Sequence, residues 1–255
     1  MVRQVDHQVQ CALMADAWGN EQFARPEPFA PLRDAAAWHD EGWRRWEDAP
    51  HVDGDGRPVD FPDLDRAVHV ALYREGIGYA LDRSEPAALL VSMHGQGLYE
   101  RRLGLDGPPV PRSERRPEVR AFLEEQSALQ RRLGTEAEQD WCWAAYRLLQ
   151  AWDLLSLYLV WRALPNGRSG RLPRVPRRAG DETGVDLLLT PSGPASCACE
   201  PYPFNRDPLE LPVTARVVED RAFADDDDLR AALAAAERVT LRCVVHRSRP
   251  VRPPR

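Results

Sequence analysis

Apolar residues recur at spacings of three and four along the first two thirds of the chain, which is the period of an amphipathic helix. This pattern predicts helices over residues 5–18, 32–47, 63–82, 86–99, 117–133 and 137–164. Loops rich in Pro, Gly, Asp or Arg separate these segments. The Arg/Pro-rich loop at residues 165–182 has no apolar period, so it is the best candidate for a domain boundary.

The pattern changes after this loop. VDLLLT (185–190), PVTARVV (212–218) and RVTLRCVV (238–245) have the apolar and β-branched character of strands. A helix at about 226–237 begins at an acidic run, which suits a helix N-terminus. The sequence therefore predicts a mainly α protein, with a helical domain over 1–163, an Arg/Pro-rich linker over 164–183 and a small α+β appendage over 184–255.

Composition indicates a folded protein and makes nucleic acid a poor default partner. Of the 255 residues, 43 % are hydrophobic and 29 % are charged, and the eight Trp are more than a disordered chain would carry. The formal net charge is −6, although all 34 basic residues are Arg. A net negative chain has no general attraction to nucleic-acid phosphates.

Several features predict a cytoplasmic protein. The five Cys are an odd number, and Cys11 and Cys142 lie within apolar helical patterns, as free thiols do in a reducing compartment. Residues 1–10 lack the apolar core of a signal peptide. Segment 141–164 is apolar, but Arg147 and Asp153 would each cost roughly 2.5–3.5 kcal/mol near a bilayer centre. We therefore interpret this segment as a buried helix and expect no membrane partner.

Four of the predicted helices carry a His or an Asp on the face that should be buried. His7 lies on the apolar stripe of the first helix, and His39 lies on that of the second, where Asp40 borders the stripe. His94 follows the apolar face of the fourth helix, just before a Gly that is typical of helix ends. Asp153 shares the apolar face of the long sixth helix.

A single inward His is more often a satisfied core residue than a ligand, but several such helices favour a shared site. An unpaired buried carboxylate is costly, and the Leu, Ala and Trp around Asp40 and Asp153 offer no partner. A divalent cation would compensate both, and mixed imidazole and carboxylate ligands suit Mn²⁺, Fe²⁺, Co²⁺, Ni²⁺ or Zn²⁺. The alternative is a purely structural ion pair between Asp153 and Arg45 or Arg147.

The order His7, then the adjacent pair His39-Asp40, then Asp153 resembles the H…HD…D signature of HD-domain metal phosphohydrolases. In that family these residues lie on different helices of an all-α bundle around one or two metal ions. The strings HDEGWRRWEDAP, LLVSMHG and WDLLSLYL look like those of an uncharacterised bacterial family, a domain of unknown function that is remotely HD-like. This resemblance covers most of residues 1–163 and implies an HD-like helical bundle there.

Members of the HD family with two metals have two further His between the pair and the final Asp. His69 and His94 occur in that interval. His94 resembles the inward His of the family and would hold a second ion or shuttle protons. The four-step neighbours of His69 are Asp65 and Tyr73, so a surface or loop-bonded His is an equally good interpretation.

The resemblance implies a metal-dependent phosphohydrolase that acts on a small phosphorylated or nucleotide-type substrate. The metal ligands would be His7, His39, Asp40 and Asp153, with His94, and Asp40 would bridge two ions. Asp40 and His94 would be the catalytic residues. Anionic oxygens of the substrate also need donors, and Arg45 and Arg147 are near the ligands in sequence, although ordinary solvated helix faces remain an alternative for such Arg residues.

Two other functions remain open. HD-type bundles with two irons can activate oxygen to oxidise a small substrate, which here would require His69 as a ligand. A non-catalytic helical module would instead bind a small ligand or play a regulatory role, and would keep the His and Asp residues only as a buried polar network.

Overall fold

A computed structural model describes residues 1–100, 112–134, 139–162 and 168–248. Most of the predicted helices are confirmed, with small shifts of their ends. The α-helices are α1 (Gln4–Ala17), α2 (Ala30–Trp38), α3 (Arg44–Asp48), α4 (Arg66–Leu81), α5 (Glu85–Glu100), α6 (Pro117–Leu133), α7 (Gln139–Leu157) and α8 (Asp226–Ala235). A π-helical turn, Tyr158–Arg162, extends α7, and short 3-10 helices lie at Glu41–Trp43, Phe61–Asp63 and Arg112–Glu114.

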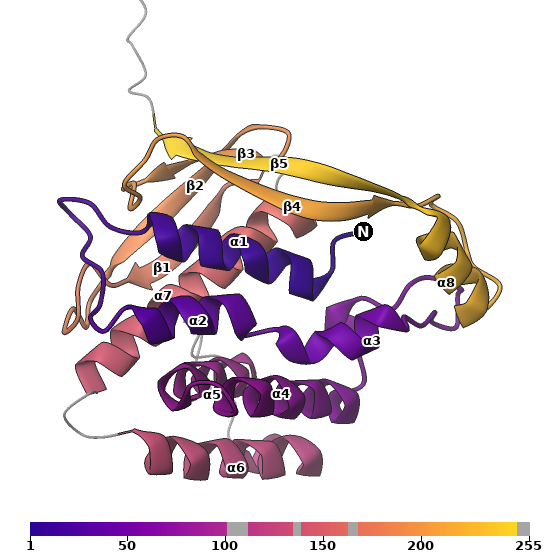
Figure 1. Ribbon diagram of the computed structural model, residues 1–255, viewed down its shortest axis with the longest axis horizontal. Helices are drawn as coiled ribbons and strands as arrows, with labels where there is room; N and C mark the ends of the chain where they lie inside the picture. Colours follow the sequence, from indigo (N-terminus) through magenta and orange to yellow (C-terminus); the bar gives the residue numbers. More distant parts are fainter. Residues whose placement is uncertain (101–111, 135–138, 163–167, 249–255) are drawn as a thin grey trace, which may run out of the picture.

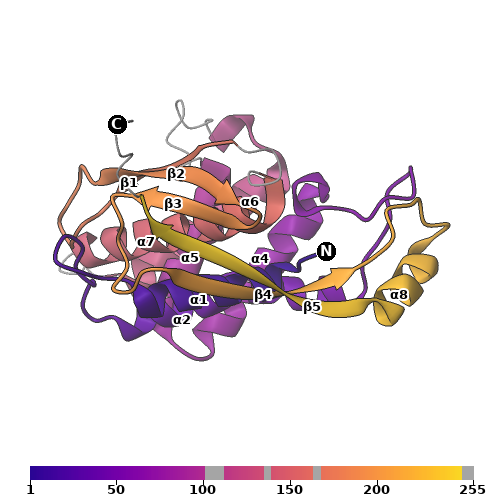
Figure 2. The same cartoon turned by 90° about the horizontal axis from the view of Figure 1, so that it is seen from above.

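Five strands form one sheet in the order β1-β2-β3-β5-β4. The strands are β1 (Gly170–Val175), β2 (Val185–Gly193), β3 (Ser196–Glu200), β4 (Leu209–Val217) and β5 (Glu237–Arg247). All neighbours are antiparallel except β3 and β5, which are parallel. Strand β1 lies within the range expected to be a linker, and β3 was not predicted. Figure 2 shows β4 and β5 extending past the other strands toward α8.

The expected fold class, an HD-like helical bundle with a small C-terminal α+β unit, is wrong. The sheet is not an appendage, because β4 packs against α1 and β1 packs against α7. Alternate residues of the strands, among them Leu187, Leu211 and Val245, belong to the same core cluster as Leu90 and Leu149 of the helices. The described residues therefore form an α+β fold in which a mixed sheet covers the helical layers.

Helix α1 lies between the sheet on one side and α2 and α7 on the other (Figure 1). Its buried positions are Val5, His7, Gln8, Gln10, Cys11, Ala12, Met14, Ala15 and Ala17, and they cover most of its circumference, leaving one face with Val9 and Asp16 exposed. A helix with so wide a buried face can present polar groups to two layers at once. This placement lets α1 connect the sheet to the polar residues of the helical layers.

Helix α7 is the buried helix expected from segment 141–164, although residues 163–167 lie outside the described ranges. Arg147 and Asp153 are 4 % and 5 % exposed, so both charged side chains lie in the protein interior. Within the described parts of the chain, every helix is too short or too polar to cross a membrane.

Helix α8 and the loop before α4 pack together at the far end of the β4–β5 hairpin. Phe223, Leu229 and Leu233 form a small separate cluster there, with Val52 against it. His51 and the backbone of Val52 both contact the carboxylate of Asp226, the first residue of α8. The acidic run before α8 therefore acts in helix capping and loop attachment, as expected for a helix start.

The predicted helix over 32–47 is interrupted at the His-Asp pair. Helix α2 ends at Trp38, and Asp40 adopts φ −113° and ψ 18° before a 3-10 turn and α3. The turn docks on α4 through Gly42, where an added Cβ would lie 1.9 Å from the carbonyl oxygen of Leu72. This close backbone approach explains the break, because only glycine allows it.

Helix α5 continues through Gly95 to Glu100 instead of ending near His94. An added Cβ at Gly95 would lie 3.2 Å from the ring of Tyr73 and 3.3 Å from the ring of Phe122. The glycine is therefore explained by close packing against two aromatic side chains, and not by helix termination.

Replacing Gly42 with alanine tests the docking of this turn. Because the new methyl group collides with backbone of α4, we expect Gly42→Ala to lower the free energy of unfolding by about 2–3 kcal/mol. The measurement is urea unfolding followed by circular dichroism. The matched control is Gly54→Ala, because nothing lies within 4 Å of an added Cβ at Gly54. This control should change stability by less than about 0.5 kcal/mol, and equal effects of the two variants would contradict the assignment.

Candidate metal centre

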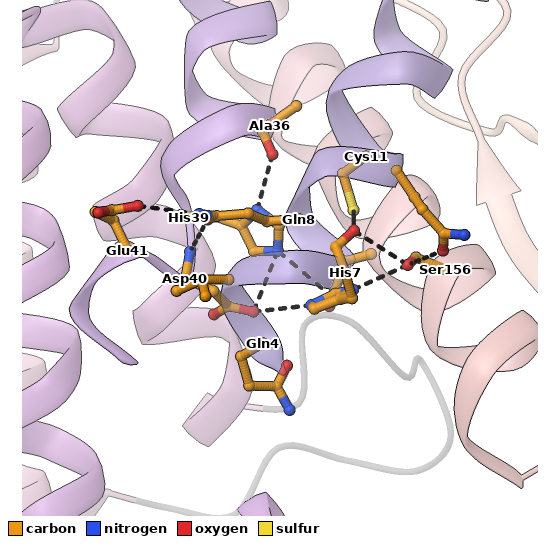
Figure 3. Close-up of polar contacts among 12 residues, drawn as sticks. Gln4, His7, Gln8, Cys11, Ala36, His39, Asp40, Glu41 and Ser156 are labelled. Carbon is orange, nitrogen blue, oxygen red and sulfur yellow. Dashed lines mark hydrogen bonds and ion pairs between the residues drawn. The ribbon is translucent and has the colours of Figure 1, made fainter. Parts of the chain in front are cut away.

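Four of the predicted ligands converge in the interior. His7 comes from α1, His39 is the C-cap of α2, Asp40 starts the 3-10 turn, and Asp153 comes from α7. Each offers one ligand atom, and these four atoms all lie within 4.8 Å of one another. The close-up in Figure 3 shows His7, His39 and Asp40 directed toward a common point.

The contacts within the cluster alternate between imidazole and carboxylate. Nε2 of His7 lies 2.9 Å from Oδ2 of Asp40 and 3.6 Å from Oδ1 of Asp153. Nε2 of His39 lies 3.4 Å from Oδ2 of Asp40 and 3.7 Å from Oδ1 of Asp153. Both imidazoles therefore turn Nε2, and not Nδ1, toward both carboxylates.

The backbone orients the His39 ring toward the two carboxylates. Its Nδ1–H donates to the carbonyl oxygen of Ala36 at 3.1 Å, one helical turn earlier. Its Nε2 is buried and faces both carboxylates at ion-pair distance, although neither contact has hydrogen-bond geometry. Once Nε2 loses its proton it presents a lone pair, while Nδ1–H stays bonded to the carbonyl, which is the usual arrangement of a metal-bound His.

A chain of hydrogen bonds from the sheet orients His7. The Gln10 amide donates from Nε2 to the Leu211 carbonyl of β4 at 2.6 Å, so its Oε1 must accept. The Ser156 hydroxyl donates to that oxygen at 2.7 Å, which leaves the Ser156 oxygen to accept from Nδ1–H of His7 at 2.9 Å. Nε2 is therefore the nitrogen that faces Asp40, to which it donates at 2.9 Å, and it would bind a metal after losing that hydrogen.

Asp40 is held from both sides. The hydroxyl of Tyr73 donates to its Oδ1 at 3.1 Å, and its backbone N–H donates to Oε1 of Gln8 at 3.0 Å. The second carboxylate oxygen, Oδ2, is the one that faces His7 and His39. Such support of the carboxylate outside the ligand set is typical of metal centres.

The electrostatics of the metal-free cluster follow from its burial and its alternating charges. Burial opposes the charged form of His39, but Asp40 and Asp153 together raise the pKa of His39 to about 9. Burial also opposes ionisation of the two carboxyl groups, yet the facing imidazoles lower the pKa of Asp40 and of Asp153 below their usual range. Both carboxylates are thus ionised at neutral pH and available as ligands.

A cavity of about 150 Å³ adjoins the cluster. Its lining residues come from several elements: Gln4, Asp40, Trp43, Phe61, Pro62, Arg66, His69, Tyr73, His94, Leu98, Asp153 and Leu157. A second cavity of about 340 Å³ is lined by His7 and shares Gln4, Phe61 and Leu157 with the first. The two cavities are therefore neighbours, and a small molecule in either would lie beside the cluster.

His94 lies in the cavity next to the four ligands. Its ring centroid is 5.0 Å from that of His39, and its Nδ1 is buried without a hydrogen-bond partner. Burial lowers the pKa of His94 to about 4, so the imidazole is neutral at pH 7. The structure thus brings His94 to the site but does not include it among the four residues of the cluster.

His69 lines the same cavity and is buried, which removes the interpretation as a surface residue. Its Nδ1 is hydrogen-bonded to the hydroxyl of Tyr99. Burial and the positive charge of Arg66 lower the pKa of His69 to about 4. His69 is also absent from the four-residue cluster.

The structure does not bring the two predicted substrate Arg residues to the site. Arg45 lies exposed on α3 and lines neither of the two cavities. Arg147 donates to Oε1 of Gln150 and to the carbonyl oxygen of Pro173, both at 2.6 Å, and so joins α7 to β1. The alternative, an ion pair of Asp153 with Arg45 or Arg147, is not formed, because Asp153 faces His7 and His39 instead.

Sequence reasoning missed the residues that orient the ligands. Ser156 follows Asp153 by three positions and so shares its helix face, which was a usable signal. Gln10 and Tyr73 had no comparable signal, because their partners belong to other elements of the fold. Arg66 was missed because the loop before α4 brings it to the cavity only in the folded protein.

The donor set fits a divalent transition metal. Two imidazole Nε2 atoms, which can lose their hydrogens to a metal, and two ionised carboxylates are a mixed set of the kind that Mn²⁺, Fe²⁺, Co²⁺, Ni²⁺ and Zn²⁺ accept. The sharpest sign is that all four ligand atoms are buried and lie within 4.8 Å of one another.

The fold and this cluster define an α+β protein with a buried candidate metal centre. Residues 1–220 match a family model described as "Protein of unknown function (DUF3891)", so the chain belongs to that family. The expected membership of an uncharacterised family is thereby confirmed, and the matched range includes every candidate ligand and strands β1 to β4. No match was found among the curated proteins or among the solved structures.

Removing the hydroxyl of Ser156 should weaken metal binding. In Ser156→Ala the His7 ring loses its acceptor, and we expect metal affinity to fall about 10- to 100-fold. Isothermal titration calorimetry of the metal-stripped protein measures this. The control is Ser92→Ala, which removes another buried serine that contacts Gln126 and Gln130 on α6. An unchanged affinity in Ser156→Ala, or an equal loss in Ser92→Ala, would contradict the orienting role.

Metal binding should release a proton from His39. Because its pKa is about 9 in the metal-free protein, the imidazole is charged at neutral pH and competes with the metal. The affinity should therefore rise with pH up to about 9, by at most about tenfold per pH unit for one proton. Titrations at pH 6.5 and 8, in buffers of different ionisation enthalpy, count the proton. Equal affinities at the two pH values would rule out this competition.

Proposed function

We propose that the protein is a metal-dependent phosphohydrolase that acts on a small, anionic, phosphorylated or nucleotide-type substrate. The observation that carries the proposal is the convergence of four buried ligand atoms, two imidazole Nε2 and two carboxylate oxygens, within 4.8 Å of one another beside a cavity.

The order of the ligands along the chain supports this function. His7, His39-Asp40 and Asp153 follow the H…HD…D order of HD phosphohydrolases; His7 and Asp153 lie on α1 and α7, and the His39-Asp40 pair follows directly after α2. We infer that the ligand set is of HD type although the surrounding fold, with its sheet against α1 and α7, differs from an HD bundle.

A divalent ion held by the cluster would polarise a phosphoryl oxygen and lower the pKa of a water molecule near it. The chain itself supplies the proton acceptor. His94 is neutral at pH 7 and lines the cavity, so its imidazole can take a proton from the attacking water beside the cluster. Tyr73 keeps the Asp40 carboxylate in place through Oδ1 during this step.

The apolar walls of the cavity assist the same chemistry. Trp43, Phe61, Leu98 and Leu157 line it together with the charged groups. Such side chains limit the water around the reacting phosphate, and electrostatic interactions are stronger where water is scarce.

The two alternative functions differ in their metal content. A di-iron oxygenase needs two ions and His69 as a ligand, whereas His69 is bonded to Tyr99 and lies outside the four-residue cluster. A non-catalytic module with only a buried polar network would hold no metal at all. Counting the ions per chain therefore separates the metal-free module from the other two functions, and the identity of the metal together with the activity separates those two.

Elemental analysis of protein purified without chelator tests the centre. We expect about one transition-metal ion per chain in the wild type, and loss of nearly all of it in the His39→Ala/Asp40→Ala variant, because half of the ligand set is removed. The matched control is His51→Ala/Asp226→Ala, which removes an exposed His–Asp pair of the same residue types far from the cavity. It should keep its metal.

Activity is then measured with a panel of phosphomonoesters and phosphodiesters. The wild type and the His51/Asp226 variant should hydrolyse the same members of the panel, and the His39/Asp40 variant should lose at least about 100-fold in rate. Full metal content in the His39/Asp40 variant would refute the ligand assignment. A metal-loaded wild type without turnover of any member would instead refute the phosphohydrolase function.

A further inference from the structure

We propose that Arg66 binds the anionic group of the substrate, so that this side chain selects a phosphate or similar oxyanion for the site. The proposal rests on the function proposed above and assigns a residue that the sequence did not single out. It replaces Arg45 and Arg147, which the structure leaves away from the cavity.

Arg66 is the first residue of α4, and it lines the 150 Å³ cavity together with Asp40, Asp153 and His94. Among the described residues, it is the cationic side chain that the cavity walls contribute. Its positive charge adds to the effect of burial in lowering the pKa of His69, which lines the same cavity. The guanidinium is therefore close enough to act on a molecule bound beside the cluster.

Arg66 differs from its neighbours in having no carboxylate partner. Arg74 on the same helix forms an ion pair with Glu125 at 2.7 Å, and Arg112 contacts Glu100 at the end of α5. Within the described ranges, Arg66 forms no ion pair or hydrogen bond of its own side chain. A guanidinium that lines a cavity and is not neutralised by an acid of the protein is available for an acid of a ligand.

The charge balance of the loaded centre shows why Arg66 would decide selectivity. Asp40 and Asp153 carry two negative charges, which equal the two positive charges of a divalent ion, and neutral imidazoles add none. Without Arg66 the loaded centre would be close to neutral. With Arg66 it has a net positive charge, and an anion is favoured over a neutral molecule of the same shape.

The geometry of the side chain also suits a phosphate. A guanidinium offers several N–H donors in one plane and can bind two oxygens of a phosphate at once, whereas an ammonium acts as a single charge. The cavity around it is partly apolar, through Trp43, Phe61 and Leu98, and this strengthens the attraction. Lysine at position 66 should therefore restore only part of the binding.

Binding of inorganic phosphate to the protein as purified tests the proposal. Isothermal titration calorimetry should give saturable binding to the wild type, at least tenfold weaker binding to Arg66→Ala, and intermediate binding to Arg66→Lys. Arg74→Ala is the matched control, because it removes an Arg from the same helix that is paired with Glu125 and does not line the cavity. It should bind phosphate like the wild type. Metal content, measured in parallel, should be the same in all four proteins.

Kinetics give a second readout on any substrate that the panel identifies. Arg66→Ala should raise KM at least tenfold with a smaller change in kcat, because the interaction is already made with the bound substrate. A merely structural role would lower stability or metal content without this split.

Two results would overturn the role of Arg66: phosphate binding by Arg66→Ala as tight as by the wild type, or no saturable phosphate binding by the wild type. The failure of the proposed function is a different result. Phosphate binding that depends on Arg66, with no hydrolysis of any phosphoester, would leave Arg66 as an anion-binding residue and refute only the phosphohydrolase.

Discussion

Two carboxylates buried side by side, those of Asp40 and Asp153, set the main constraint on this structure. Each would be costly without a compensating charge, because the interior offers little solvation. The chain meets this constraint with His7 and His39, whose Nε2 atoms face both carboxylates. The two imidazoles compensate the carboxylates only if their Nε2 atoms point toward them. The contacts that orient the two rings are therefore needed to keep Asp40 and Asp153 buried.

This dependence gives the C-terminal sheet a role in the candidate centre. The Leu211 carbonyl of β4 orients the Gln10 amide, the amide orients the Ser156 hydroxyl, and the hydroxyl accepts from His7. Helix α1 can carry both Gln10 and His7 because its buried face is wide enough to meet the sheet and the helical layers. A helical domain that folded without the sheet would lack the first group in this chain. The sheet therefore belongs to the site as well as to the hydrophobic core.

Sequence periodicity was enough to predict the convergence of the ligands but not the architecture around them. The inward faces of four helices could be identified because each residue type and its spacing are local properties. The sheet packing could not, since β1 contains Pro and Arg, β3 has only five residues, and neither shows which helix it will cover. The break at His39 also depends on a distant element, because Gly42 docks on the backbone of α4.

His39 and His94 are adjacent imidazoles in one buried site, but their pKa values are shifted in opposite directions. The rings of His39 and His94 lie 5.0 Å apart, yet the pKa of His39 is raised to about 9 and that of His94 is lowered to about 4. Both are buried, so burial cannot be the difference. His39 has both carboxylates within 3.7 Å of its Nε2, while no such ion pair fixes His94 among the described residues. Two neighbouring groups can take different chemical roles when their pKa values are shifted in opposite directions. This difference agrees with the proposed roles of His39 as a metal ligand and of His94 as the neutral base beside it.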